Sequence, residues 1–235
     1  GDVDATGEVV ARDPDGRYLA VRCQLRGRPT VIVVGHADNT TDAHQAAFFE
    51  RLQRSLPTRR ADEEYYFLLD ANNAPNWALD YRRVTGQPTP QDRPLGLAAM
   101  QTLLNAYAVG DAFRHLHPDA REFTRDETTA QKTVLVSQRR LDRIYVPRAQ
   151  LRKDAMPHVA AASHAWPGQT DMAALRALGS KSAWSDHAAV RCTVRSSAVA
   201  QAKRPWSMPL HVLAELPAVT HMRGMAAVAN AEAAE

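Results

Sequence analysis

The chain has 235 residues and is mildly basic, with a formal net charge of +3. Hydrophobic residues make up 45% of it and charged residues 23%, which excludes wholesale disorder and predicts a sizeable core in one large domain or two small ones. We expect no membrane partner and no signal peptide, because no apolar stretch could span a bilayer and the start is acidic. The distant Cys23 and Cys192 exclude a cysteine-based zinc site and favour two buried thiols over a single disulfide.

The first half of the chain alternates strand-like and helix-like segments. An alternating apolar pattern and two β-branched or aromatic runs indicate strands. Asp42, with Gln45 three residues later, predicts the start of a helix that ends before Pro57. The predicted elements up to residue 107 are strands over 17–24, 30–34 and 65–69, and helices over 42–56 and 97–107.

The second half reads as a strand pair over 133–137 and 141–146, an alanine-rich and partly helical stretch over 160–178, and a last strand over 188–194. After Arg195 the composition shifts to serine, alanine and glutamine. We therefore predict a folded domain over residues 1–195 and a linker or tail over 196–235. Alternating strands and helices, with some neighbours joined as hairpins, predict a layered α/β fold with a mixed sheet.

Asp70 and Asn72 follow the buried strand over 65–69. The ends of such strands are where α/β folds often place groups that contact ligands. The alternative is a turn in which the aspartate side chain binds its own backbone, and for these two residues alone the turn is the favoured interpretation.

Two further carboxylates stand near a histidine or within a strand. Asp186 and His187 precede the last strand, and a histidine beside a carboxylate can act in acid–base chemistry or donate to a phosphate. Asp142 interrupts an apolar, strand-like run, where an unpaired charge is costly. His187 is its candidate partner, because an aspartate that accepts from a histidine fixes the tautomer of the ring. The alternative for Asp142 is an edge-strand charge that faces water.

In this order, the motifs resemble those of the endonuclease/exonuclease/phosphatase superfamily. Residues 69–72 read LDAN and keep the Asp and Asn of G-D-F-N, although the preceding Gly is absent. Residues 140–142 keep R-x-D, and residues 185–187 keep S-D-H. Residues 109–124, VGDAFRHLHPDAREFT, further resemble a D-x-W-R…P…Y-T stretch of endonuclease domains in long interspersed (non-LTR) retroelements, with Phe for the Trp and Tyr. Residues 203–216 resemble the connector that follows such domains.

The resemblance implies a four-layer α/β sandwich, in which two facing sheets are flanked by helices, and cleavage of phosphodiester bonds with Mg²⁺ or Mn²⁺. It implies that Asp70 positions or deprotonates the attacking water and that Asn72 orients water or phosphate. It also implies that His187 donates to a phosphate oxygen, that Asp142 orients His187, and that Asp186 lies by the metal.

The resemblance also implies four contacts to phosphate or nucleic acid, from His36, Asn39, Arg114 and Arg140. The family pattern Y-x-P-N is altered to HADN over residues 36–39. The early strands that bear an asparagine and a metal-binding glutamate have no match, so we expect an N-terminally incomplete domain, a fragment of a longer retroelement-type reading frame.

Three functions are therefore considered. The first is a metal-dependent endonuclease that acts on DNA, for which we expect an intracellular location, in the nucleus for a retroelement enzyme. The second is a degenerate, non-catalytic remnant that binds nucleic acid through arginine-rich loops or binds nothing, because the metal-binding glutamate is missing. The third and weakest is a phosphatase or phospholipid diesterase of the same superfamily. The sequence leaves the oligomeric state open.

Overall fold

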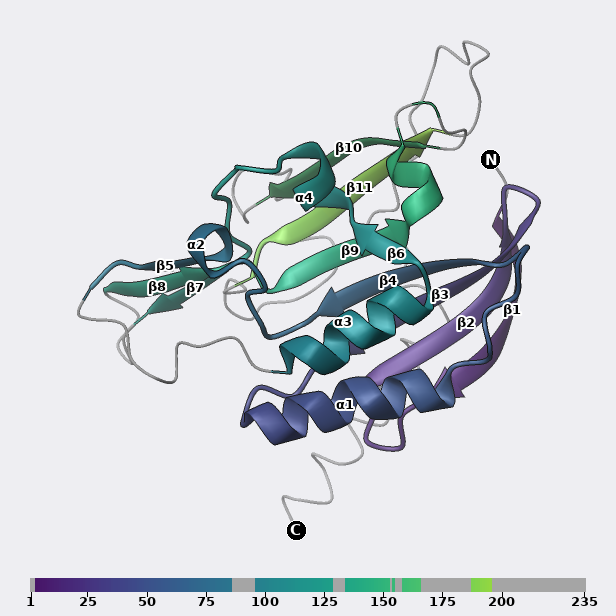
Figure 1. The fold of residues 1–235 in the computed structure, drawn as a ribbon, viewed down its shortest axis with the longest axis horizontal. Helices are drawn as coiled ribbons and strands as arrows, with labels where there is room; N and C mark the ends of the chain where they lie inside the picture. The colour runs from purple at the N-terminus through teal and green to yellow at the C-terminus, as the bar shows by residue number, and fades with distance from the viewer. Residues whose placement is uncertain are drawn as a thin grey trace, which may run out of the picture.

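A computed structural model describes residues 3–85, 96–128, 134–152, 154, 158–165 and 187–195. Its centre is a six-stranded mixed sheet (Figure 1). The strands, in spatial order, are β1 (Val3–Arg12), β2 (Tyr18–Leu25), β3 (Arg28–His36), β4 (Glu64–Asp70), β9 (Asp142–Pro147) and β6 (Val109–Asp111). The predicted strands over 17–24, 30–34 and 65–69 are thereby confirmed, whereas β1 and β6 were not predicted.

Strands β1, β2 and β3 form an antiparallel meander, and β3 then runs parallel to β4. The β2–β3 turn is made by Arg26 and Gly27, which both have positive φ values, of 56° and 73°. Two positive φ values are typical of the tight hairpin turn whose twist matches that of its strands. The parallel β3–β4 connection instead needs a crossover, which helix α1 (Asp42–Ser55) supplies.

Helix α1 packs beside α3 (Leu97–Ala106) on one face of the sheet. Both predicted helices are confirmed, but the cap of α1 differs from the prediction. Thr41, not Asp42, accepts from the backbone N–H of His44, while the Asp42 carboxylate accepts from the N–H of Gly96 at 2.6 Å. The apolar core between helices and sheet is formed by buried side chains that include Phe48, Phe49, Leu52, Phe67, Met100 and Leu103.

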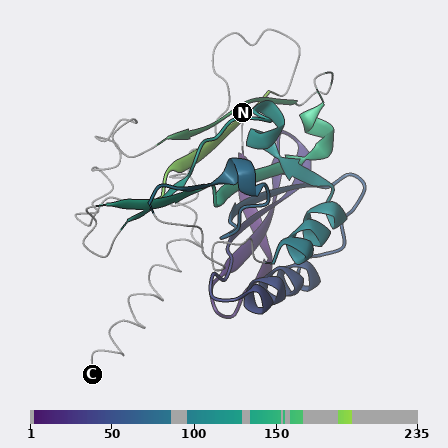
Figure 2. The ribbon, with the colours of Figure 1, turned by 60° about the vertical axis from the view of Figure 1, so that its left-hand side comes forward.

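The other face of the large sheet packs against a two-stranded sheet of β10 (His158–Ala165) and β11 (Ala189–Arg195), with a second apolar core between them. Figure 2 shows α1 and α3 on one side of the large sheet and the β10–β11 pair on the other. A mixed α/β sandwich of layered sheets flanked by helices is therefore confirmed. The described residues supply its helical layer, its large sheet and this second sheet.

A third sheet has the order β5 (Tyr81–Arg83), β8 (Leu135–Arg139) and β7 (Arg125–Thr128), and it extends away from the layers beside the short helix α2 (Trp77–Asp80). The predicted pairing of 133–137 with 141–146 is wrong. Their strands, β8 and β9, join different sheets, because β8 pairs with β5 and β7 while β9 pairs with β4 and β6. Two short helical turns complete the described elements, α4 (Ala112–Leu116) and η2 (Arg148–Leu151).

Three other predictions meet different outcomes. The helical interpretation of 160–178 is wrong for residues 160–165, which lie in β10 and pair with β11; the rest of that stretch lies outside the described residues. The proposed tail over 196–235 also lies outside them and stays a prediction. Both cysteines are free thiols, of which Cys192 is buried and Cys23 only half-buried. None of the helices among the described residues is long and apolar enough to cross a membrane.

Candidate active site

The candidate active site lies where three strand ends meet at one edge of the large sheet. His36 ends β3 and is the register partner of Asp70, which ends the parallel strand β4. Asp142 begins β9 and is paired directly across from Asp70 in antiparallel register. The Asp142 side chain is 18% exposed and contacts His187, so the alternative of an unpaired edge-strand charge that faces water is wrong. The strand order therefore sets the two carboxylates side by side.

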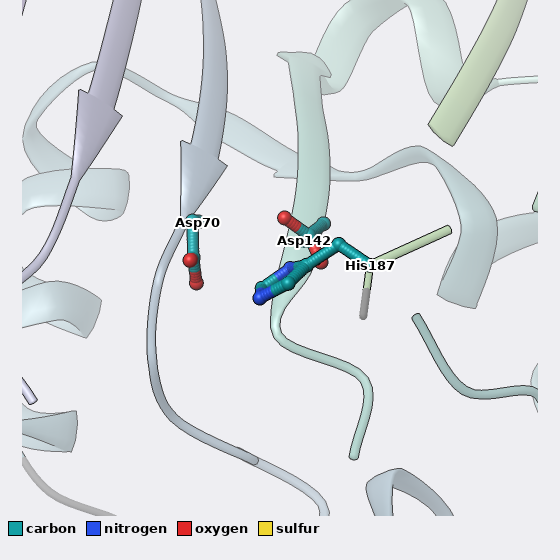
Figure 3. Close-up of side chains that lie close together, drawn as sticks. All are labelled: Asp70, Asp142 and His187. Carbon is teal, nitrogen blue, oxygen red and sulfur yellow. The ribbon is translucent and has the colours of Figure 1, made fainter. Parts of the chain in front are cut away.

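His187 completes a group of three that we call the site triad: Asp70, Asp142 and His187 (Figure 3). Its Nδ1 atom lies 2.8 Å from Oδ2 of Asp142, which is the predicted contact between these two side chains. One ligand atom from each of the three residues lies within 4.8 Å of the others. The three side chains are half-buried, so the group is open to a ligand while partly shielded from water.

The electrostatics of Asp70 differ from those of an ordinary surface aspartate. Burial raises the pKa of its carboxyl above the ordinary value, and the neighbouring charge of Asp142 raises it further, while His187 lowers it. A carboxylate with a raised pKa is a better proton acceptor. This environment suits Asp70 to acid–base work on a bound water.

Asn72 has a structural role in two loops, and the sequence indicated only one part of it, the turn. Its backbone N–H donates to Oδ1 of Asp70 at 3.1 Å, and it adopts a left-handed conformation with a φ of 47°, so the turn favoured on sequence grounds is present. Its side-chain Nδ2 donates to the carbonyl of Ala37 at 2.8 Å. Asn72 therefore ties the loop after β4 to the loop after β3.

The other two predicted contacts are His36, at the end of β3, and Asn39, in the loop that follows. The Nε2 atom of His36 lies 3.5 Å from Oδ2 of Asp70, and its side chain is 60% exposed. Asn39 is exposed three residues later in the same loop. Both side chains are thus accessible to a ligand bound near the site triad. Asp186, the predicted metal residue, lies outside the described residues.

The phosphate contacts predicted for Arg140 and Arg114 stay predictions, but both side chains have partners inside the protein. The Arg140 side chain is only 2% exposed; its Nε donates to Oδ1 of Asp80 at 2.8 Å and its Nη2 to Oδ2 of Asp111 at 2.7 Å. Arg114 donates from Nη2 to Asp80 at 2.6 Å and from Nη1 to the carbonyls of residues 117, 118 and 120. Both guanidinium groups are engaged inside the protein, because buried charges need partners.

Together with Arg143 these residues form what we call the arginine–aspartate cluster: Asp80, Asp111, Arg114, Arg140 and Arg143. Sequence reasoning missed Asp80 altogether, since it lies in a segment that reads as loop and its partners are distant in the chain. Burial acts to raise the pKa of the Asp80 carboxyl, but Arg143, Arg140 and Arg114 outweigh it and lower that pKa to about 2. The cluster therefore joins α2, β6 and the start of β9 through buried ion pairs.

No protein-family model matches the chain, and no curated protein matches its sequence. Among solved structures it is similar to an AP endonuclease from Archaeoglobus fulgidus, with a TM-score of 0.54 and 13% identity over 82% of this chain and 71% of that one. It is also similar to D. rerio TDP2 complexed with a single-strand DNA product, with a TM-score of 0.50 and 16% identity over 81% and 67% of the chains.

A 3′-5′ exonuclease (NExo) from Neisseria meningitidis aligns with a TM-score of 0.48 and 16% identity over 81% of this chain and 71% of that one. At these identities a likeness shows the fold, and the first two structures carry that conclusion. The chain shares the layered α/β fold of these two structures.

Proposed function

We propose that this protein is a metal-dependent phosphodiester hydrolase that cleaves DNA. The observation that carries the proposal is the contact between His187 Nδ1 and Asp142 Oδ2 at 2.8 Å, placed beside Asp70 at the end of β4. DNA is the proposed substrate because the likeness in fold includes an AP endonuclease and a TDP2 bound to a DNA product. An intracellular location, in the nucleus if the protein is a retroelement endonuclease, is part of the same proposal.

The three triad residues divide the chemistry between them. Asp70 positions the attacking water and takes a proton from it. Asp142 accepts from the Nδ1–H group of His187 and fixes the orientation and charge of the ring. The Nε2–H group on the other side of the ring then donates to a non-bridging phosphate oxygen and stabilises the negative charge that develops there.

Asn72 and His36 have supporting roles at the same edge. Nδ2 of Asn72 donates one of its two N–H groups to Ala37, so its amide oxygen and its second N–H group remain to orient the attacking water or a phosphate oxygen. His36, exposed and 3.5 Å from Asp70, would donate to the phosphate from the opposite side of Asp70 to His187. Asn39 would contact the nucleic acid farther along the loop.

The magnesium or manganese ion implied by the motif resemblance fits the donor set of this edge. Asp70 and Asp142 are paired across two strands, and a cation bound between them would offset their mutual repulsion. Their carboxylate oxygens would hold it, since hard divalent ions prefer oxygen ligands. When bound, such an ion polarises the phosphate and neutralises developing charge.

Nicking of supercoiled plasmid in the presence of Mg²⁺ or Mn²⁺ tests the proposal. We expect the wild-type protein to nick, and we expect Asp70→Asn and His187→Gln each to lose the activity. Asp154→Asn is the matched control, because Asp154 is a 71% exposed aspartate paired only with Arg152 among the contacts of the structure. Nicking that survives in Asp70→Asn would contradict the proposed site.

A second candidate is a non-catalytic protein that binds nucleic acid. Among the described residues, the one group with metal-binding geometry contains two aspartates and a histidine. It lacks the metal-binding glutamate that the motif resemblance implies, and this favours the second candidate. It predicts DNA binding that weakens steeply with salt, without nicking by any variant.

The finer proposal of a retroelement endonuclease rests on residues 109–124. Three of the matching residues have clear structural environments. Asp111 caps α4 and binds Arg140, Arg114 binds Asp80, and Thr124 is fully buried. These environments explain why the residue types occur together there. Preferential nicking of one short DNA sequence, mapped by primer extension, would support this finer proposal, and uniform nicking would count against it.

A further inference from the structure

Thr124 makes several hydrogen bonds to the backbone around the site triad. Its side chain is fully buried, in the segment between α4 and β7. Its Oγ1 atom accepts two backbone N–H groups, from Leu141 at 2.9 Å and from Asp142 at 3.0 Å. One hydroxyl oxygen therefore fixes the backbone of a triad residue at the point where β9 begins.

The backbone of Thr124 reaches a second triad residue. Its carbonyl accepts the N–H group of Ala188, next to His187, at 2.6 Å, and the following residue, Arg125, forms a β-bridge with His187 itself. Its own N–H group donates to the carbonyl of Arg139 at 2.9 Å. Thr124 thus holds the segment that bears His187 against the segment that bears Asp142.

The third triad residue is connected through one further step. The carbonyl of Leu141, whose N–H group is bound by Thr124, accepts from the N–H group of Ala71 at 2.9 Å. Ala71 directly follows Asp70 in the chain. The backbone hydrogen bonds of all three triad segments therefore meet at Thr124 and its neighbour Leu141.

We propose that Thr124 is a positioning residue that sets the geometry of the Asp142–His187 pair through the backbone. The inference rests on the proposed function of the triad. A methyl in place of the hydroxyl would leave the N–H groups of Leu141 and Asp142 buried without an acceptor, which proteins rarely tolerate. The start of β9 would shift to find other partners, and Asp142 would move relative to His187.

The kinetic test compares Thr124→Val, which keeps the shape but loses the acceptor, with Thr124→Ser, which keeps the acceptor. Small misplacements of catalytic groups cost about 100-fold in rate, so we expect Thr124→Val to lower kcat by about 10- to 100-fold with KM changed less than about threefold. Thr124→Ser should restore kcat to within about threefold of wild type on the same argument.

Thr30→Val is the matched control. Thr30 is equally buried in β3, and its hydroxyl donates to the carbonyl of Arg28, at the end of the strand opposite the triad. We expect its kcat to stay at the wild-type value. If Thr30→Val and Thr124→Val lowered kcat and melting temperature equally, the effect of Thr124 would be general stability and the proposal would be overturned.

A spectroscopic readout keeps the test independent of catalysis. The Nδ1–H proton of His187 reports on its hydrogen bond to Asp142, and ¹⁵N-histidine labelling with a His187→Gln reference assigns it among the 9 histidines of the chain. We expect this signal to shift or disappear in Thr124→Val and to remain in Thr124→Ser and Thr30→Val. An unchanged signal in Thr124→Val overturns the positioning role, whether or not the wild-type protein cleaves DNA.

Discussion

The site triad and the arginine–aspartate cluster are both groups of charged side chains in contact. Arg140 of the cluster stands only two residues before Asp142 of the triad, yet the environments of the two groups differ. In the cluster, Asp80 is 1% exposed and contacts three guanidinium groups. In the triad, Asp70 and Asp142 are each 18% exposed and face each other at a sheet edge. In the cluster every charged side chain contacts at least one of opposite charge, whereas the triad keeps two like charges close together and accessible. The first arrangement favours stability and the second favours chemistry.

This comparison predicts that substitutions in the triad change the rate and leave the fold intact. Asp142→Asn removes the charge that orients His187, and the loss of such an orienting aspartate costs about 10⁴ in kcat in enzymes with comparable pairs. We expect a loss of at least about 10³-fold in nicking, or about 4 kcal/mol. Relief of the repulsion with Asp70 should leave the melting temperature unchanged or raise it. A large drop in melting temperature would contradict the prediction that Asp142 affects the rate and not the stability.

Substitutions in the cluster should have the opposite signature. Asp80→Asn leaves buried guanidinium groups without their counter-charge, and breaking a buried ion pair in this way destabilises proteins by about 3 to 5 kcal/mol. Chemical denaturation measures this loss directly. Nicking per folded molecule, measured well below the melting temperature, should remain within about tenfold of wild type. A specific loss of nicking with unchanged stability would place Asp80 in the chemistry instead.

The smallest of the three effects is the dependence of stability on acid. The pKa of Asp80 is about 2 in the folded protein and 3.8 ordinarily, so its stabilisation is complete above pH 4 and disappears as the pH falls toward 2. The contribution is about 2 kcal/mol. Urea unfolding at a series of acidic pH values should show this slope in the wild type, and the slope should be shallower in Asp80→Asn. Parallel curves for the two proteins would show that the arginines do not lower this pKa.

The strands that bear the triad could be predicted because buried strands with β-branched and aromatic runs are recognisable by pattern alone. The run over 65–69 and the acid within 141–146 therefore located Asp70 and Asp142 correctly. Strand β10 could not be found in this way. Its sequence, HVAAASHA, has the alanine content of a helix, and pairing with β11 overrides that local preference.

The internal partners of two arginines could not be predicted, for a different reason. Arg114 and Arg140 stand within motif-like stretches, and an arginine in such a place suits phosphate contact by its chemistry. Whether it is available depends on burial and on partners, and the decisive partner, Asp80, lies far from both in sequence. Patterns within short windows carry no information about such distant pairs.

The pairing of β4 with β9 has a consequence for how the protein folds. The β1–β2–β3 meander and the α1 crossover join segments that are close in sequence, so they can form early. The antiparallel contact of Asp70 with Asp142, and the contact of Asp142 with His187, both close long loops, which is slow because loop entropy must be lost first. The triad is therefore expected to assemble late, and a nascent chain on the ribosome would lack the complete triad until the segment that bears His187 emerged.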